Sequence, residues 1–421
     1  MKNWNRFETE TRESMAGLPR LIQPLLTWLT GKPLTAKESQ FHLPPWLDVV
    51  GTLLLAGLAE LALLSLSRQD SLPAWCGIIA LWILLVGLLR KIQVTHLHHA
   101  IHNRLFNRAA INLVYSHLAP ALLFIQNRDE YRKEHLEHHN STFFTTRKDA
   151  DAAFLALLGF IPGRTKRELW TNLWVIIFSP TFHFLFARNR LKSTFITAKP
   201  SAIVFSVMVA CGYAVLFNAA GWKAFTVAII IPLFPLYHIS ALLQFLTEHA
   251  WNVSAGPVEN REQYKERCWG RFCGEKFPIR RQGFIPSLTF TGQVFLWSVK
   301  MNCLHLPTRL ACLVSDLPVH DWHHLAHMAG QDARDWHRSL HLREIAIADG
   351  DKPGFSRREL WGMPHMLAHQ FGWLESISCR YELPAEQSIG NETIEVSEQW
   401  PTKTIPGKPS SSSTPNSRPL S

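Results

Sequence analysis

Long apolar runs alternate with charged stretches along this chain of 421 residues. Four runs come close to the roughly 20 residues that an α-helix needs to cross a bilayer. They cover residues 46–66, 72–89, 202–220 and 224–245. Because the first two runs and the last two are each separated by only a few polar residues, each pair forms a hairpin. The pattern predicts an all-α integral membrane protein with about four transmembrane helices in two hairpins.

Two further apolar segments are interrupted by proline. Residues 111–125 contain Pro120, and residues 169–187 contain Pro180. The first is too short to span comfortably, and a proline inside a helix removes a hydrogen bond and bends it. We expect the first segment to be re-entrant or interfacial, and the second to lie in the interface instead of crossing the membrane.

Positive charge follows the ends of the apolar runs. Arg90 and Lys91 close the second run, and Arg188, Arg190 and Lys192 precede the third. Since cytoplasmic loops carry an excess of Lys and Arg, these ends are expected on the cytoplasmic side. Because the N-terminus shows no signal peptide or organelle signal, the expected membrane is a bacterial inner membrane. The net charge is +10, but no folded basic motif indicates a nucleic-acid partner. Seven scattered cysteines form no disulfide framework.

Composition divides the chain into three parts. Residues 1–44 form a polar, cytoplasmic N-terminal segment that is partly amphipathic around Leu18–Leu29. Two placements are open for this amphipathic part: Trp28 anchors it in the membrane interface, or it forms a short helix that packs on the rest of the protein. Residues 45–382 form the membrane domain, with a cytoplasmic, helical, histidine-rich cap. Residues 383–421 are rich in Ser and Pro, which predicts a disordered tail.

Three histidine boxes are the chemical signal of the chain. One has the form HxxxH and two have the form HxxHH, and both spacings place imidazoles on one helix face. Imidazole suits Fe, Zn, Cu and Ni. Eight such histidines are more than one ion needs, so a two-metal site is expected. The boxes contain His98 and His102, then His135, His138 and His139, then His320, His323 and His324.

Boxes of these forms between long apolar segments resemble the membrane fatty acid desaturase and hydroxylase family of di-iron enzymes, over roughly residues 45–345. The resemblance implies two Fe ions, O₂ as co-substrate and a ninth ligand, His249, just past the last apolar run; an interfacial histidine is the alternative for this residue. His96 and His99 both compete for a place in the first box, and a position beside the ligands is the alternative for His96. Asp321, Glu134, Glu137, Asp149, Asp151 and Glu248 are candidates to orient imidazoles, although Asp149 also suits a helix N-cap.

Breaking a C–H bond of an alkyl chain requires redox chemistry with O₂, which zinc cannot perform. We therefore expect a membrane-bound, O₂-dependent fatty acyl desaturase, an oxidoreductase of lipid metabolism. A hydroxylase, another oxygenase or an acetylenase with the same centre is the alternative. A transporter or metal-binding protein is disfavoured because the boxes lie outside the spans.

The substrate is expected to be a lipid, an acyl-CoA or an acyl-carrier-protein thioester. The sequence contains neither the His-Pro-Gly-Gly motif of a cytochrome b5 domain nor a dinucleotide fingerprint before a helix. Electrons are therefore expected from a separate ferredoxin, rubredoxin or cytochrome b5 with its reductase.

Overall fold

The computed structural model describes residues 11–38, 43–254, 256–279, 284–330 and 335–377. The chain divides into two units, Met1–Tyr381 and Glu382–Ser421. The second unit, and with it the predicted tail 383–421, lies outside the described residues.

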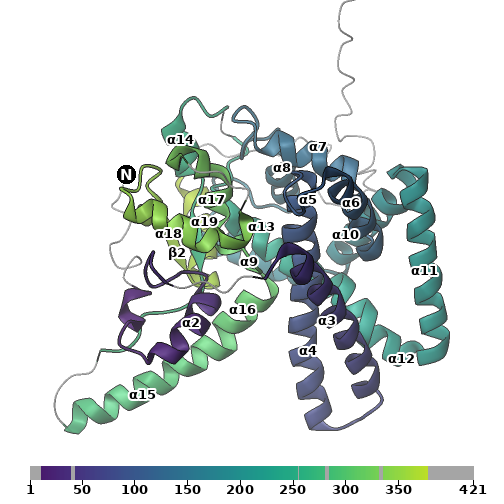
Figure 1. Ribbon diagram of the computed structural model, residues 1–421, viewed down its shortest axis with the longest axis horizontal. Coiled ribbons are helices and arrows are strands. Elements are labelled where there is room, and N and C mark those ends of the chain that lie inside the picture. The colour runs from purple at the N-terminus through teal and green to yellow at the C-terminus, as the bar shows by residue number, and fades with distance from the viewer. Residues whose placement is uncertain (1–10, 39–42, 255, 280–283, 331–334, 378–421) are drawn as a thin grey trace, which may run out of the picture. The chain divides into compact units, whose positions relative to one another are not determined.

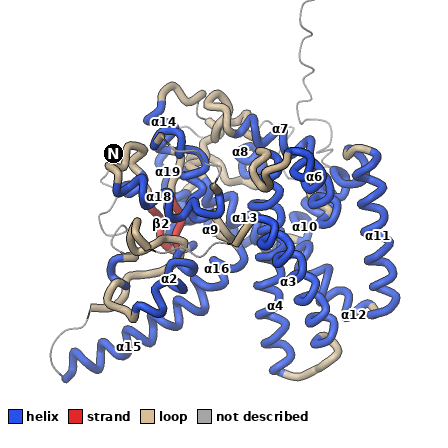
Figure 2. Tube along the Cα trace, in the orientation of Figure 1, coloured by secondary structure: helices blue, strands red, loops and turns tan. Residues whose placement is uncertain are grey.

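The first unit is mostly helical (Figures 1 and 2). Its α-helices are α2 Gln23–Thr30, α3 Pro45–Leu66, α4 Leu72–Lys91, α5 His98–Ile101, α6 Ala109–Leu123, α7 Arg128–His138, α8 Ala150–Leu157, α9 Lys166–Phe178, α10 Pro180–Lys192, α11 Pro200–Ala220, α12 Trp222–Phe225, α13 Tyr237–Glu248, α14 Arg261–Glu266, α15 Phe284–Lys300, α16 Leu306–Ala311, α17 His320–Leu325, α18 Ser339–Ala348 and α19 Met363–Ser376. The strands are β1 Gly270–Phe272 and β2 Glu359–Trp361.

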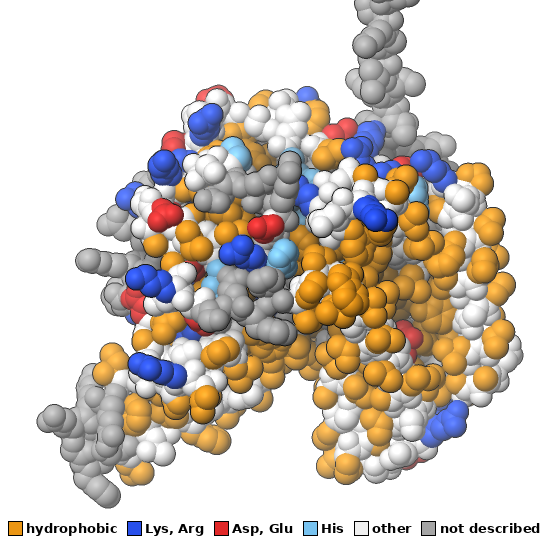
Figure 3. Space-filling view, in the orientation of Figure 1, with side chains coloured by type: hydrophobic (Ala, Val, Ile, Leu, Met, Phe, Trp, Pro, Cys, Tyr) orange, Lys and Arg blue, Asp and Glu red, His pale blue; other side chains and the backbone are white. Residues whose placement is uncertain are grey.

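Four helical rods are long and apolar enough to cross a membrane. They cover Pro45–Leu66, Leu72–Ile101, Pro200–Ala220 and Trp222–Glu248, so the four-span prediction is confirmed and the chain is an integral membrane protein. The turns of the two hairpins meet at one end, where Lys223 Nζ lies 2.7 Å from Asp70 Oδ1. In Figure 3 hydrophobic side chains dominate the surface over the spans, while most charged side chains gather elsewhere on this face.

The two proline-interrupted segments are bent. Ala109–Leu123 meets Arg128–His138 at 107°, and Lys166–Phe178 meets Pro180–Thr197 at 66°. Such a bend is the shape of a re-entrant segment or of a broken span. Their interfacial placement therefore stays a prediction.

The second span ends in an irregular helical turn. Ser71 caps the start of α4 by accepting a hydrogen bond from the Ala74 amide, and Arg90 and Lys91 in the last turn suit the negative end of its dipole. The rod continues through a π-helical stretch, Ile92–Leu97, into α5. Because a π-helix is wider than an α-helix and often marks a functional site, the first histidine box does not simply extend a face of α4.

The N-terminal helix packs on the rest of the unit. Leu26 and Leu29 of α2 are buried in a cluster with Met15 and Met301. Arg309 of α16 donates from Nε to the Trp28 carbonyl oxygen at 2.7 Å. The structure thus supports the packed alternative for this segment.

A small sheet was not predicted. β1 and β2 pair in parallel, with Gly270 opposite Glu359 and Phe272 opposite Trp361. Strands of three residues are too short to show an alternating pattern, so no periodicity in the sequence indicated them. The sheet holds two buried charged side chains, Arg271 and Glu359, close to the third histidine box.

Candidate metal centre

The nine predicted histidines converge into two groups through their Nε2 atoms. In the first group five Nε2 atoms follow one another at 2.9–3.0 Å. Their order is His98, His323, His139, His135 and His102. Four of these residues, all except His139, have ligand atoms that lie within 4.8 Å of one another.

The second group is entirely buried. His138 Nε2 lies 3.2 Å from His249 Nε2, and His324 Nε2 lies 3.1 Å from His320 Nε2. The ligand atoms of these four residues also lie within 4.8 Å of one another. His249, which was inferred from the family resemblance alone, is therefore brought to the same place as the box histidines.

Each HxxHH box serves both groups. In the box at 135–139, His135 and His139 belong to the first group and His138 belongs to the second. In the box at 320–324 the division is reversed: His320 and His324 belong to the second group and His323 belongs to the first. On a helix, positions i+3 and i+4 lie on either side of position i and differ by about 100°. Adjacent histidines of one box therefore diverge to two sites instead of binding one ion together.

The imidazoles suit a metal cation. Burial lowers the pKa of His249, His320 and His324 well below the usual value, and neighbouring cationic groups lower it further. In His138 burial also lowers the pKa, but the Asp149 carboxylate outweighs it and raises the pKa of this imidazole to about 9. Neutral imidazoles have a free lone pair, and ring nitrogens that face one another at about 3 Å repel unless a proton or a metal cation lies between them. A set of imidazole nitrogens fits Fe, Zn, Cu or Ni.

Oxygen atoms behind the imidazoles fix their orientation. Asp149 Oδ2 lies 2.7 Å from Nδ1 of His138, and the Arg267 carbonyl oxygen lies 3.2 Å from Nδ1 of His249. A carboxylate and a carbonyl accept, so Nδ1 carries the proton in both histidines and Nε2 is left for the metal.

Asp149 has both of the roles considered for it, because it also caps α8 by accepting from the Asp151 amide.

Tyr264 was not predicted: its hydroxyl lies 2.8 Å from Nδ1 of His324. No motif or spacing in the sequence distinguishes this tyrosine.

His96 and His99 lie outside both groups. His96 Nε2 lies 2.8 Å from Asp48 Oδ2, and His99 Nε2 lies 2.8 Å from Asp316 Oδ2. The ring of His99 also stacks on Trp336. Neither carboxylate was identified from the sequence, because each is far along the chain from its histidine.

The remaining carboxylates have different partners. Glu134 accepts from the Gln126 side chain at 2.7 Å. Asp321 accepts from the guanidinium of Arg343 at 2.9–3.1 Å, so it anchors the third box to α18. Glu248 Oε1 lies 3.2 Å from His320 Nε2.

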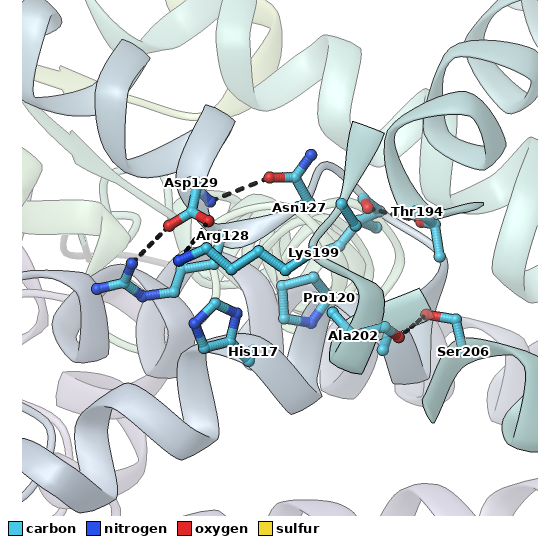
Figure 4. A pocket seen from close by; sticks show the side chains of 12 residues that line it. His117, Pro120, Asn127, Arg128, Asp129, Thr194, Lys199, Ala202 and Ser206 are labelled. Carbon is cyan, nitrogen blue, oxygen red and sulfur yellow. Dashed lines mark hydrogen bonds and ion pairs between the residues drawn. The ribbon is translucent and has the colours of Figure 1, made fainter. Parts of the chain in front are cut away.

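A separate cavity, open to solvent, lies between α6, the start of α7 and the start of α11 (Figure 4). At its mouth Asp129 pairs with Arg128 at 2.7 Å and with Lys199 at 3.1 Å. None of the nine histidines lines it. The pocket is therefore separate from the metal centre.

Comparison with known proteins agrees with this centre. No curated protein and no solved structure matches the chain. Residues 73–275 match the sequence model of the fatty acid desaturase family, whose members are di-iron oxidoreductases. The match includes the first two boxes and His249; the third box lies beyond it, yet the structure brings its histidines to the same two groups. Through residues 73–275 the chain belongs to the fatty acid desaturase family, and it is an oxidoreductase.

Proposed function

We propose that the protein is an O₂-dependent fatty acyl desaturase that introduces a double bond into an acyl chain with two Fe ions held by the nine histidines. The observation that carries this proposal is the convergence of nine Nε2 atoms from four separate segments into two adjacent groups. Iron would supply the oxidation of the alkyl chain with O₂ and two electrons.

The protein's own residues hold and shield the centre. His98, His102, His135, His139 and His323 would hold one ion, and His138, His249, His320 and His324 the other. The acceptors behind His138, His249 and His324 keep the ring nitrogens in the tautomer that binds a metal. Burial of the second group keeps bulk water away from the reacting positions.

The position of the centre suits a membrane substrate. His98 follows α4 within one continuous span, and His249 directly follows the span that ends at Glu248. An acyl chain lying among the apolar spans would therefore reach the histidines from the membrane. The head of the substrate would be a lipid, coenzyme A or an acyl carrier protein, on the cytoplasmic side that Arg90 and Lys91 indicate. A separate ferredoxin, rubredoxin or cytochrome b5 would deliver the electrons.

The test is the fatty acid profile of bacterial cells that express the full chain, measured by mass spectrometry. We expect a new double bond with the wild type and its loss with His135→Ala. The matched control is His117→Ala, whose side chain lines the separate cavity, and it should keep the product. A new hydroxyl group instead of a double bond would identify a hydroxylase. A protein purified without iron, together with an unchanged profile, would refute the di-iron assignment.

A further inference from the structure

The carboxylate of Glu248 contacts the second histidine group on the side where its Nε2 atoms meet. It is the last residue of α13 and is 7% exposed. Its Oε1 lies 3.2 Å from Nε2 of His320. The same Nε2 lies 3.1 Å from Nε2 of His324, so this is the nitrogen that faces the group.

The other side-chain oxygens near these imidazoles contact Nδ1, whereas Glu248 contacts Nε2. Asp149 lies at Nδ1 of His138, and the Tyr264 hydroxyl lies at Nδ1 of His324. These oxygens are behind the rings and can only orient them. Glu248 differs, because a metal bound to His320 Nε2 would lie next to its carboxylate oxygen.

The two groups differ by one donor. Five imidazoles are linked in the first group and four in the second. We propose that Glu248 supplies a carboxylate oxygen as the fifth ligand of the metal in the second group. This inference rests on the proposed function, since it assumes that the groups hold metal.

The carboxylate is held in the orientation that this role requires. Gln244 Nε2 donates to Glu248 Oε2 at 3.0 Å, and the side-chain oxygen of Gln244 accepts in turn from the guanidinium of Arg90. Arg271 Nη2 lies 3.9 Å from Oε1. Gln244 therefore engages Oε2, which leaves Oε1 as the oxygen that contacts His320 of the group.

An ion pair with a protonated His320 is the competing explanation. A proton on Nε2 would remove this nitrogen from the ligand set, since a ligand must offer its lone pair. The group would then keep three imidazoles, and Glu248 would contribute charge but no bond to a metal. The two explanations predict different metal spectra.

The experiment compares purified full-length wild type with Glu248→Gln, which keeps the size of the side chain but removes its charge. Glu134→Gln is the matched control, because Glu134 is likewise held by a glutamine amide and no imidazole partner of it is seen among the described residues. Each protein is loaded with ⁵⁷Fe, challenged with a chelator, and examined for iron content and by Mössbauer spectroscopy.

We expect two Fe per chain and two distinct iron signals in the wild type and in Glu134→Gln. In Glu248→Gln one signal should shift, and the affinity of one position should fall by at least the 10–100-fold that loss of an orienting partner costs. If Glu248→Gln is not monodisperse, Glu248→Asp replaces it: its charge is kept, its oxygen is withdrawn by one methylene, and the same signal should shift.

Failure of the proposed function and failure of the Glu248 ligand assignment give different results. A wild type that binds no iron would refute the proposed function. A wild type with two Fe, together with a folded Glu248 variant whose spectrum and affinity are unchanged, would refute the ligand assignment and leave the function standing.

Discussion

Replacing Gly87 by alanine should displace two helices that each precede a histidine box. Gly87 lies in α4, which leads into the first box, and it faces the backbone of α16, which precedes the third box. A Cβ at this position would lie 1.8 Å from the Leu310 carbonyl oxygen. Backbone atoms cannot rotate away as a side chain does, so the helices must move apart.

The required movement is large for a metal centre. Carbon and oxygen atoms in a close C–H···O contact stay about 3.3 Å apart, so α4 and α16 must separate by about 1.5 Å. Metal–ligand distances tolerate only about 0.2 Å. His98 and His323, whose Nε2 atoms lie 3.0 Å apart, belong to the two displaced parts. Overpacking should also cost about 1–3 kcal/mol, partly offset by the roughly 1 kcal/mol that alanine gains over glycine in a helix.

The assay is iron content per chain together with the Tm of the purified protein. Gly57→Ala in α3 is the matched control, because its new Cβ would have nothing within 4 Å. We expect Gly57→Ala to keep its iron and its Tm, and Gly87→Ala to lose iron from the first group and to melt several degrees lower. A Gly87→Ala protein with full iron content and an unchanged Tm would show that the close approach does not position the histidines.

Three further substitutions test other parts of the centre. His98→Ala should lower the iron content while His96→Ala leaves it unchanged, because the Nε2 of His96 bonds a carboxylate outside both groups; equal losses would contradict this assignment. Asp149→Asn should weaken metal binding by about 10–100-fold in a chelator titration, since it replaces the charged acceptor behind one imidazole with a neutral amide, and an unaltered titration would count against it. Arg343→Met should destabilise the protein by about 3–5 kcal/mol because Asp321 is left as an unpaired buried charge. Adding Asp321→Asn should restore part of the lost Tm, and no recovery would mean that the pair is not the cause.

The membrane spans and the histidine set were predictable from the sequence because both are local patterns. The length of an apolar run decides whether a helix can cross a bilayer, and the predicted runs 46–66 and 202–220 agree closely with α3 and α11. The spacing of the boxes likewise identified the histidines that converge. His249 came only from the family resemblance, since a single histidine has no pattern of its own.

Only the tertiary structure decided how these histidines are shared. The local twist of the helix turns His138 and His139 in different directions, but packing of α7 against its neighbours decides which group each of them joins. Tyr264 behind His324, and Asp316 opposite His99, are contacts between residues 60 and 217 positions apart, and no local periodicity encodes such distances. Local sequence therefore determined which residues were available, while long-range packing determined which nitrogen faces a metal and which atom orients it.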